Sequence, residues 1–158
     1  MNTAGSSSGV SRFAGLYCAA SRLIDKLQPL LLLVFRLYVA KVFWMSGLTK
    51  TRDWSITLAL FTDEYHVPLL PPAAAAFMGT ATELSMPVLL ALGLGTRFGA
   101  FVLFFFNIIA VVSYPALADI QVKDHILWGT MILVILIFGP GKISLDHLLE
   151  RRLGRGTA

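Results

Sequence analysis

Four blocks of apolar residues, separated by polar links, constrain this chain more than any other feature of its sequence. They run from about Leu27 to Leu48, Ala73 to Gly93, Arg97 to Tyr114 and His125 to Phe138. A helix needs about 20 mostly apolar residues to cross a bilayer. We therefore expect an all-α integral membrane protein, a four-helix bundle to which each block contributes one span.

The composition agrees with this expectation. Hydrophobic residues make up 56% of the chain and charged residues 14%, whereas soluble domains have about 45–50% and about 25%. These values argue against a soluble enzyme and a disordered chain. The net charge of +4 comes from Lys and Arg residues found mostly at the ends of the apolar blocks, so we expect no nucleic-acid partner. The single cysteine, Cys18, leaves no pair for an intrachain disulfide.

The distribution of Lys and Arg predicts how the chain is oriented, because cytoplasmic loops carry an excess of these residues. With four spans, both termini lie on one side of the membrane. That side carries Arg12, Arg22, Lys26, Arg97, Lys142, Arg151, Arg152 and Arg155, and the other carries Lys50, Arg52 and Lys123. We therefore expect a multi-pass protein of the inner (plasma) membrane with both termini in the cytoplasm.

The remaining segments predict short peripheral elements. Residues 1–26 are expected to form a disordered tail and an amphipathic interfacial helix, although a cytoplasmic extension of the first span fits as well. Residues 27–149 form the expected membrane domain, and its long outer link, 49–70, is expected to include an interfacial helix. Ser144 is a candidate N-cap for a short helix, and residues 150–158 form a basic cytoplasmic tail.

Polar residues interrupt each apolar block at a similar expected depth. They are Arg36, Glu83, Asn107 and His125, with Trp128 in the same layer. Ionisable groups inside spans are costly and usually face protein or water. Two interpretations stay open: Arg36 and Glu83 form a buried ion pair that fixes helix packing, or Glu83, Arg36 and His125 line a pocket for a small ligand, a proton or an electron carrier. Lys41, about 140° from Arg36 around the helix, cannot face the same interior axis.

Several motifs, taken in order, resemble the DoxX family. They are Leu33–Ala40 followed by Ser46–Lys50, Thr82–Leu84 with Pro87, Leu92–Arg97, and His125 and Trp128 followed by Gly139–Asp146. The resemblance covers roughly Leu27 to Leu149. It implies a small four-helix inner-membrane protein of a family linked to sulfur oxidation and quinone reduction. It also directs attention to Arg36, Lys50, Glu83, Arg97, His125 and Trp128, and Lys41 departs from the small residue expected there.

We therefore expect a redox-associated subunit that binds a quinone or a small sulfur species between the helices. Glu83 and His125 are the candidate catalytic residues, moving protons, and Arg36, Lys50, Asn107 and Trp128 are candidate ligand-binding residues. We expect no metal site, because the sequence contains no compact ligand motif, and a quinone is the one cofactor considered. Other interpretations stay open: the protein is a non-catalytic membrane anchor or an assembly partner for another protein, or it forms a small-solute or proton pathway. A homo-oligomer also stays open. The sequence therefore does not decide whether the protein is an enzyme.

Overall fold

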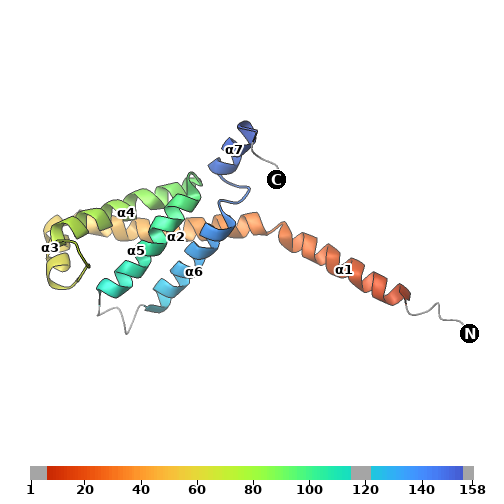
Figure 1. Cartoon of the computed structure of the whole chain (residues 1–158), viewed down its shortest axis with the longest axis horizontal. Coiled ribbons are helices and arrows are strands. Elements are labelled where there is room, and N and C mark those ends of the chain that lie inside the picture. The colour runs from red at the N-terminus through yellow and green to blue at the C-terminus, as the bar shows by residue number, and fades with distance from the viewer. Residues whose placement is uncertain (1–6, 115–121, 155–158) are drawn as a thin grey trace, which may run out of the picture.

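The computed structural model describes residues 7–114 and 122–154, and within these ranges the chain is helical and contains no strand (Figure 1). The ends of the expected tails, residues 1–6 and 155–158, lie outside the described residues. The helices are α1 (Ser7–Asp25), α2 (Gln28–Arg52), α3 (Trp54–Asp63), α4 (Pro72–Leu92), α5 (Thr96–Ser113), α6 (Val122–Phe138) and α7 (Leu145–Arg152).

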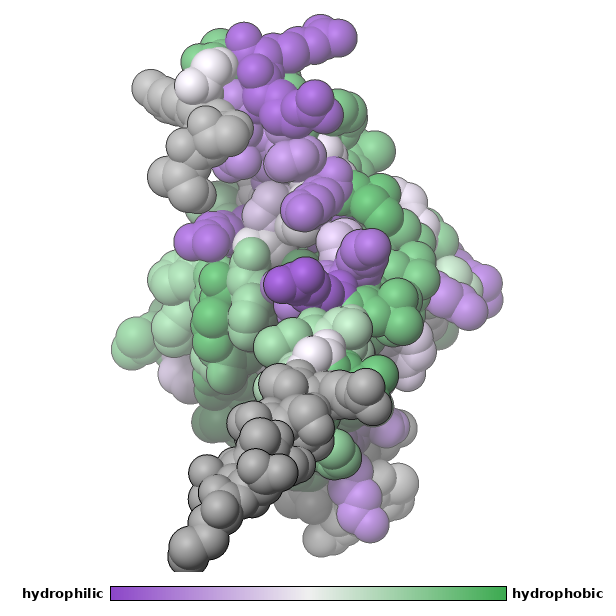
Figure 2. Space-filling view, turned by 90° about the vertical axis from the view of Figure 1, so that its right-hand side faces the viewer, coloured by the Kyte–Doolittle hydropathy of each residue, from purple (hydrophilic) through white to green (hydrophobic). Residues whose placement is uncertain are grey.

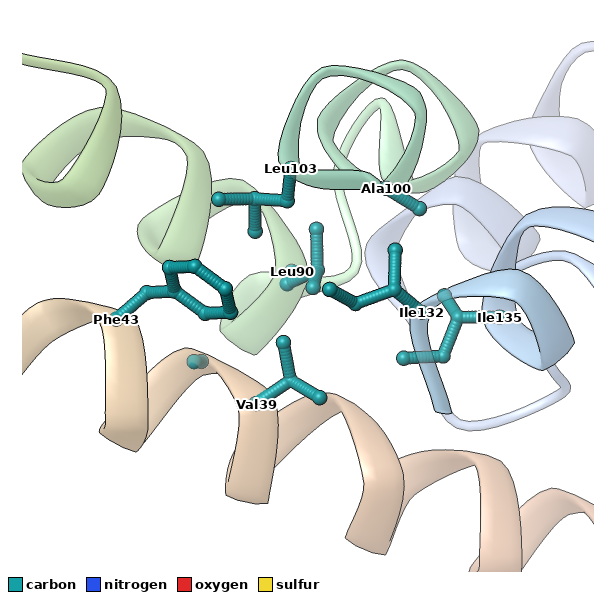
Figure 3. Packing of buried hydrophobic residues seen from close by; sticks show 8 residues of the cluster. Val39, Phe43, Leu90, Ala100, Leu103, Ile132 and Ile135 are labelled. Carbon is teal, nitrogen blue, oxygen red and sulfur yellow. The ribbon is translucent and has the colours of Figure 1, made fainter. Parts of the chain in front are cut away.

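Helices α2, α4, α5 and α6 pack around one apolar core. Figure 3 shows side chains of all four meeting there, with Val39 and Phe43 from α2 facing Leu90 from α4 and Leu103 from α5. Ala100 of α5 and Ile132 and Ile135 of α6 complete the labelled group. Because small and large side chains alternate across these contacts, the helices interdigitate closely.

The helix boundaries lie close to those expected, with one consequential difference. Helix α2 continues to Arg52, four residues beyond Leu48, so Lys50 lies on a helix instead of in a link. Helix α3 then begins at once, because the Asp53 carboxylate accepts hydrogen bonds from the backbone N–H groups of Ser55 and Ile56 at 2.9 and 3.1 Å. The helix expected in the outer link is therefore present.

A compact set of contacts joins the ends of α4, α5 and α6. Gly93 ends α4 in the left-handed conformation (φ 68°), and a Cβ there would come within 2.6 Å of both Arg36 Nη2 and Ser144 Cβ. Asp146 of α7 accepts from the backbone N–H groups of Gly95 and Thr96 at 2.7 and 2.9 Å. Ser144 caps α7 as expected, accepting from His147 N at 3.1 Å. Helix α7 is thereby fixed across the α4–α5 turn.

Among the residues that the structure describes, three stretches of helix are long and apolar enough to cross a membrane, and they lie within Phe13–Arg52, Pro72–Leu92 and Thr96–Ser113. The chain is thus an all-helical protein with membrane-spanning character. Helix α6 is shorter, with 17 residues, or about 26 Å at 1.5 Å per residue. Three of its exposed side chains, Ile126, Leu133 and Ile137, are nevertheless apolar.

Helix α1 extends away from the packed helices (Figure 1). It begins at Ser7 and ends at Asp25, within the region where the sequence predicts a helix. Its apolar side chains, among them Phe13, Leu16, Tyr17 and Leu23, are exposed. Figure 2 views the molecule from this end, with hydrophilic residues gathered over α7 at the top and hydrophobic residues over much of the surface below.

Candidate functional site

An ion pair between α2 and α4 forms the centre of the candidate site. The Lys50 ammonium donates to both Glu83 carboxylate oxygens at 2.7 and 2.8 Å, and to the Ser46 hydroxyl at 3.0 Å. The Ser46 hydroxyl in turn donates to Glu83 Oε1 at 3.0 Å. Ser46 and Lys50 can both reach one carboxylate because residues four apart share a helix face. The side chains of Lys50 and Glu83 are only 14% and 6% exposed.

A glycine allows this close approach of the two helices. A Cβ at Gly47 would lie 2.8 Å from Leu84 Cδ2 and 3.0 Å from Glu83 Cβ. Small residues let helix backbones come together in this way. The α2–α4 contact therefore depends on the same turn of α2 that presents Ser46 and Lys50.

A large apolar cavity of about 680 Å³ opens on one side of the ion pair. It lies between α4, α5 and the link that follows α3, and its volume falls in the range of small-molecule sites, about 300–1,000 Å³. Aromatic and aliphatic side chains make up most of its wall, and Lys50 and Glu83 are its charged groups. The wall includes Phe61, Leu70, Met78, Phe101, Val102, Phe105 and Ile109.

A second, smaller cavity of about 210 Å³ lies on the other side of the ion pair, and we call it the polar chamber. Its wall is formed by Val42, Phe43, Ser46, Lys50, Tyr65, Glu83, Phe106, Ala110, Tyr114, His125 and Trp128. Five of these residues also line the apolar cavity: Lys50, Tyr65, Glu83, Phe106 and Ala110. The ion pair therefore lies in the wall between a strongly apolar cavity and a smaller, more polar one.

His125 is held at the polar chamber by two hydrogen bonds with Asn107. The ring Nδ1 lies 2.8 Å from Asn107 Oδ1, and Asn107 Nδ2 donates to the His125 backbone carbonyl at 3.0 Å. The ring also packs edge-on against Trp128, with 4.8 Å between centroids. Trp128 in turn packs edge-on against Phe43 at 6.1 Å. Helices α5 and α6 thereby fix the position of this imidazole.

Arg36 lies elsewhere. Its guanidinium is buried, 1% exposed, and donates to four backbone carbonyls. Two of them end α4, Leu90 O at 2.8 Å and Ala91 O at 3.1 Å. The other two follow α6, Pro140 O at 2.6 Å and Ile143 O at 2.8 Å. Carbonyls at helix C-termini lack helical partners, and Arg36 supplies donors both to the end of α4 and to the link that follows α6.

The structure thus places the polar residues that the sequence predicted at one depth in two separate groups. Among the described residues, Glu83 makes its ion pair with Lys50, and the pair with Arg36 that the sequence left open is not formed. The expected grouping of Arg36 with Glu83 and His125 is therefore wrong, although Arg36 faces the protein interior as expected. Lys50, Glu83, His125 and Trp128 do line one chamber. Asn107 reaches that chamber through His125, and Lys41 is exposed.

Sequence reasoning did not identify Ser46 and Tyr65 as parts of this site. The spacing of Ser46 and Lys50 was the available signal for Ser46. Tyr65 comes from the link between α3 and α4 and stacks between Phe61 and Tyr114, with 4.7 Å between centroids on each side. Burial, with a smaller effect from the nearby Glu83 carboxylate, raises the pKa of Tyr65 to about 12. Its hydroxyl is consequently neutral at physiological pH and can donate a hydrogen bond.

The site can offer a ligand an ammonium, a carboxyl group and hydroxyls beside an apolar cavity. Within residues 7–114 and 122–154, no three His, Cys, Asp or Glu side chains are grouped as a metal site would require. The arrangement is suited to an apolar molecule that carries a hydrogen-bonding head group, since such a molecule needs both kinds of surface.

Comparison with known proteins agrees with the architecture. Residues 31–116, more than half of the chain, match the DoxX family. A protein of Haemophilus influenzae described as "Uncharacterized protein" is 30% identical over 129 residues, which cover 76% of this chain and 83% of that protein. No solved structure matches the chain. The match over residues 31–116 includes both halves of the Lys50–Glu83 pair, and the chain belongs to the DoxX family.

Proposed function

We propose that this membrane protein binds a quinone in the apolar cavity, as a redox-associated subunit, with the quinone head group at Lys50 and Glu83. The observation that carries the proposal is the position of a buried, hydrogen-bonded ion pair in the wall of an apolar cavity of about 680 Å³. Of the ligands that the sequence left open, a quinone fits this wall better than a small sulfur anion, because an anion would have to leave water for an apolar surface.

Each part of the site has a role in this proposal. The three N–H groups of the Lys50 ammonium donate to Ser46 and to both Glu83 oxygens. Lys50 can donate to a quinone carbonyl by exchanging the bond to Ser46, so that it remains paired with Glu83. The Glu83 carboxyl is the proton carrier nearest to that carbonyl. Phe101 and Phe105, on the far wall, pack against the ring and its tail. Electrons come from a redox-active partner protein, and the proposal assigns this chain only binding and protonation.

The proposal includes a membrane arrangement with four spans. Helix α6 forms the fourth span, and both termini lie in the cytoplasm of a cell with an inner membrane. Two observations support this: α6 packs along α2 and α5, and Asp146 binds the α4–α5 turn, which places the start of α7 beside that turn. Cysteines placed in the α4–α5 turn and in α7 should be protected from membrane-impermeant thiol reagents added outside intact cells.

Quinone binding is tested on the purified full chain in lipid nanodiscs. A short-chain ubiquinone analogue should raise the melting temperature of the wild type, because a ligand at 100 times its Kd stabilises by about 2.7 kcal/mol. Glu83→Gln and Lys50→Met should reduce the shift at least fivefold. Two control variants remove a carboxylate and an ammonium from exposed positions: Glu150→Gln on α7 and Lys41→Met on α2. Both should leave the quinone-dependent shift in melting temperature unchanged.

Two results would contradict the proposal. One is the absence of any quinone-dependent shift in the wild type. The other is an equal shift in Glu83→Gln and in Glu150→Gln, which would place the quinone away from the ion pair. A shift produced by thiosulfate instead, lost in Lys50→Met, would assign the site to a small sulfur species.

A second candidate function, assembly with another protein, is favoured by α1. This helix extends from the packed helices and exposes Phe13, Leu16 and Tyr17 (Figure 1). Cys18 is exposed on the same helix, so a maleimide cross-linker attached to it reacts with whatever molecule lies beside α1. A stoichiometric cross-linked protein, lost when Leu16 and Tyr17 are replaced by Gln, would support assembly, and exclusive attachment to lipid would contradict it.

A further inference from the structure

The hydrogen bonds of Asn107 determine where His125 carries its proton. Asn107 Nδ2 lies 3.0 Å from the His125 backbone carbonyl, which can only accept, so this end of the amide is the NH₂ group. The other end is therefore the carbonyl oxygen, which also can only accept. Because that oxygen lies 2.8 Å from His125 Nδ1, Nδ1 must be the protonated nitrogen.

Neutral imidazole has one proton, so His125 Nε2 is left as an unprotonated acceptor. The ring lines the polar chamber. The edge contact with Trp128 and the bond to Asn107 restrict its rotation. A base is thus held at the chamber in one tautomer.

The chamber itself is suited to water. Its volume of about 210 Å³ corresponds to roughly seven waters at about 30 Å³ each. A buried water needs two to four polar partners, and the polar residues of the wall include Ser46, Tyr65, Lys50 and Glu83. The groups that can exchange a proton on this wall are Lys50, Tyr65, Glu83, Tyr114 and His125, and the charge of Asp124 also acts on His125.

From this arrangement we infer that the polar chamber is a water-filled proton route, in which His125 Nε2 takes up a proton and passes it through water to the Glu83 carboxylate. The transfer breaks the Nε2–H bond of the imidazolium and forms an O–H bond at Glu83, with Lys50 keeping its charge. Asn107 is a positioning residue that holds Nδ1 protonated throughout. This inference rests on the proposed function, since it supplies the proton carrier of the quinone site from the side opposite the quinone.

The tautomer is tested by ¹⁵N NMR on histidine-labelled protein in nanodiscs. The chain has 3 histidines, and the signals of His66 and His147 are assigned by replacing each with Gln. At neutral pH, His125 should show a protonated Nδ1 and an unprotonated Nε2. Asn107→Asp keeps an acceptor for Nδ1 and should preserve this form, whereas Asn107→Leu should shift most of the population to the Nε2-protonated form. A wild-type His125 protonated at Nε2 would overturn the inference.

The route is tested by releasing protons with a flash from a caged acid and following the carboxyl infrared band that is absent in Glu83→Gln. Val42 lines only the polar chamber and Val102 only the apolar cavity. Val42→Phe and His125→Asn should therefore slow proton uptake by Glu83 at least tenfold. Val102→Phe and Val34→Phe, the second on the exposed face of α2, should change it less than twofold.

Three outcomes of the flash experiment would overturn the route: no proton uptake by Glu83, an unchanged rate in Val42→Phe, or equal slowing in Val102→Phe. None of these measurements contains a quinone. If quinone binding fails while these results hold, the proposed function is lost and the proton route remains. If binding succeeds and Val42→Phe has no effect on uptake, the quinone site remains and its proton enters by another path.

Discussion

Replacing Arg36 with methionine tests most directly whether Arg36 joins the helix ends and acts independently of the Lys50–Glu83 pair. The substitution keeps much of the apolar stem and removes the guanidinium donors to Leu90 O, Ala91 O, Pro140 O and Ile143 O. Leu90 O keeps one donor, the Gly93 N–H at 3.2 Å. Each buried acceptor left unsatisfied costs about 1–3 kcal/mol. Counting Pro140 O and Ile143 O, whose bonds are 2.6 and 2.8 Å, at the lower value, the variant should lose at least about 2 kcal/mol.

Thermal unfolding of the purified protein in nanodiscs measures this loss. For a chain of this size, 1 kcal/mol corresponds to about 2–4 °C, so Tm should fall by about 4–8 °C. Proteolysis in the 139–144 link should also become faster, because two of the lost bonds hold that link. Lys41→Met removes a cation from the exposed face of the same helix and should change stability by less than about 0.5 kcal/mol.

A double-mutant cycle with Glu83→Gln completes the test. Leu90 lies seven residues after Glu83 on α4, about 10 Å along the axis, and sites this far apart usually act additively. We expect a coupling energy below about 0.5 kcal/mol. A coupling well above that, or a loss below about 1 kcal/mol for Arg36→Met alone, would refute the assignment of Arg36 to the helix ends.

Three further predictions concern the elements around the site. Gly47→Ala should destabilise the protein by about 1–3 kcal/mol, because the new Cβ would lie 2.8 Å from Leu84 Cδ2. Gly15→Ala in α1 is the control: a Cβ there would have nothing within 4 Å, so this variant should be as stable as the wild type or more so. Chemical denaturation compares the two variants. Ser144→Ala should cost about 1 kcal/mol through loss of the α7 cap, seen as faster proteolysis of α7. The pKa of Tyr65 is raised from 10.0 to about 12 in the folded protein. Its contribution to stability is therefore complete below pH 10 and is lost as pH rises through 12. Between pH 10 and 12 the unfolding midpoint of the wild type should fall more steeply than that of Tyr65→Phe.

The sequence predicted the helices well because apolar block length and turn residues are local signals. The start of α4 near Pro72, its end at Gly93 and the Ser144 cap of α7 all depend on neighbouring residues, and each lies within a residue of its expected place. The interior orientation of Arg36 also followed from its helix face. These features need no knowledge of which helix lies beside which.

The partners of the polar residues could not be predicted in the same way, because they depend on how far each helix extends beyond its neighbours. Counting residues from the ends of the blocks placed Arg36 and Glu83 at nearly one depth. In the structure Arg36 binds Leu90, two residues before the end of α4, although Arg36 is eight residues into α2. Helix α2 therefore begins well before the level at which α4 ends, and the common reference plane assumed in that count does not exist.

The position of the Lys50–Glu83 pair is the strongest argument that it serves more than packing. A buried ion pair is poor evidence for stability, because the cost of removing both charges from water often exceeds their attraction, and apolar residues of similar volume often stabilise as well. The α2–α4 contact already has a close approach at Gly47. A pair kept only for packing would be expected among tightly packed side chains. This pair instead lies in the wall between a strongly apolar cavity and a more polar one, where a carboxyl group can meet a ligand on one side and water on the other.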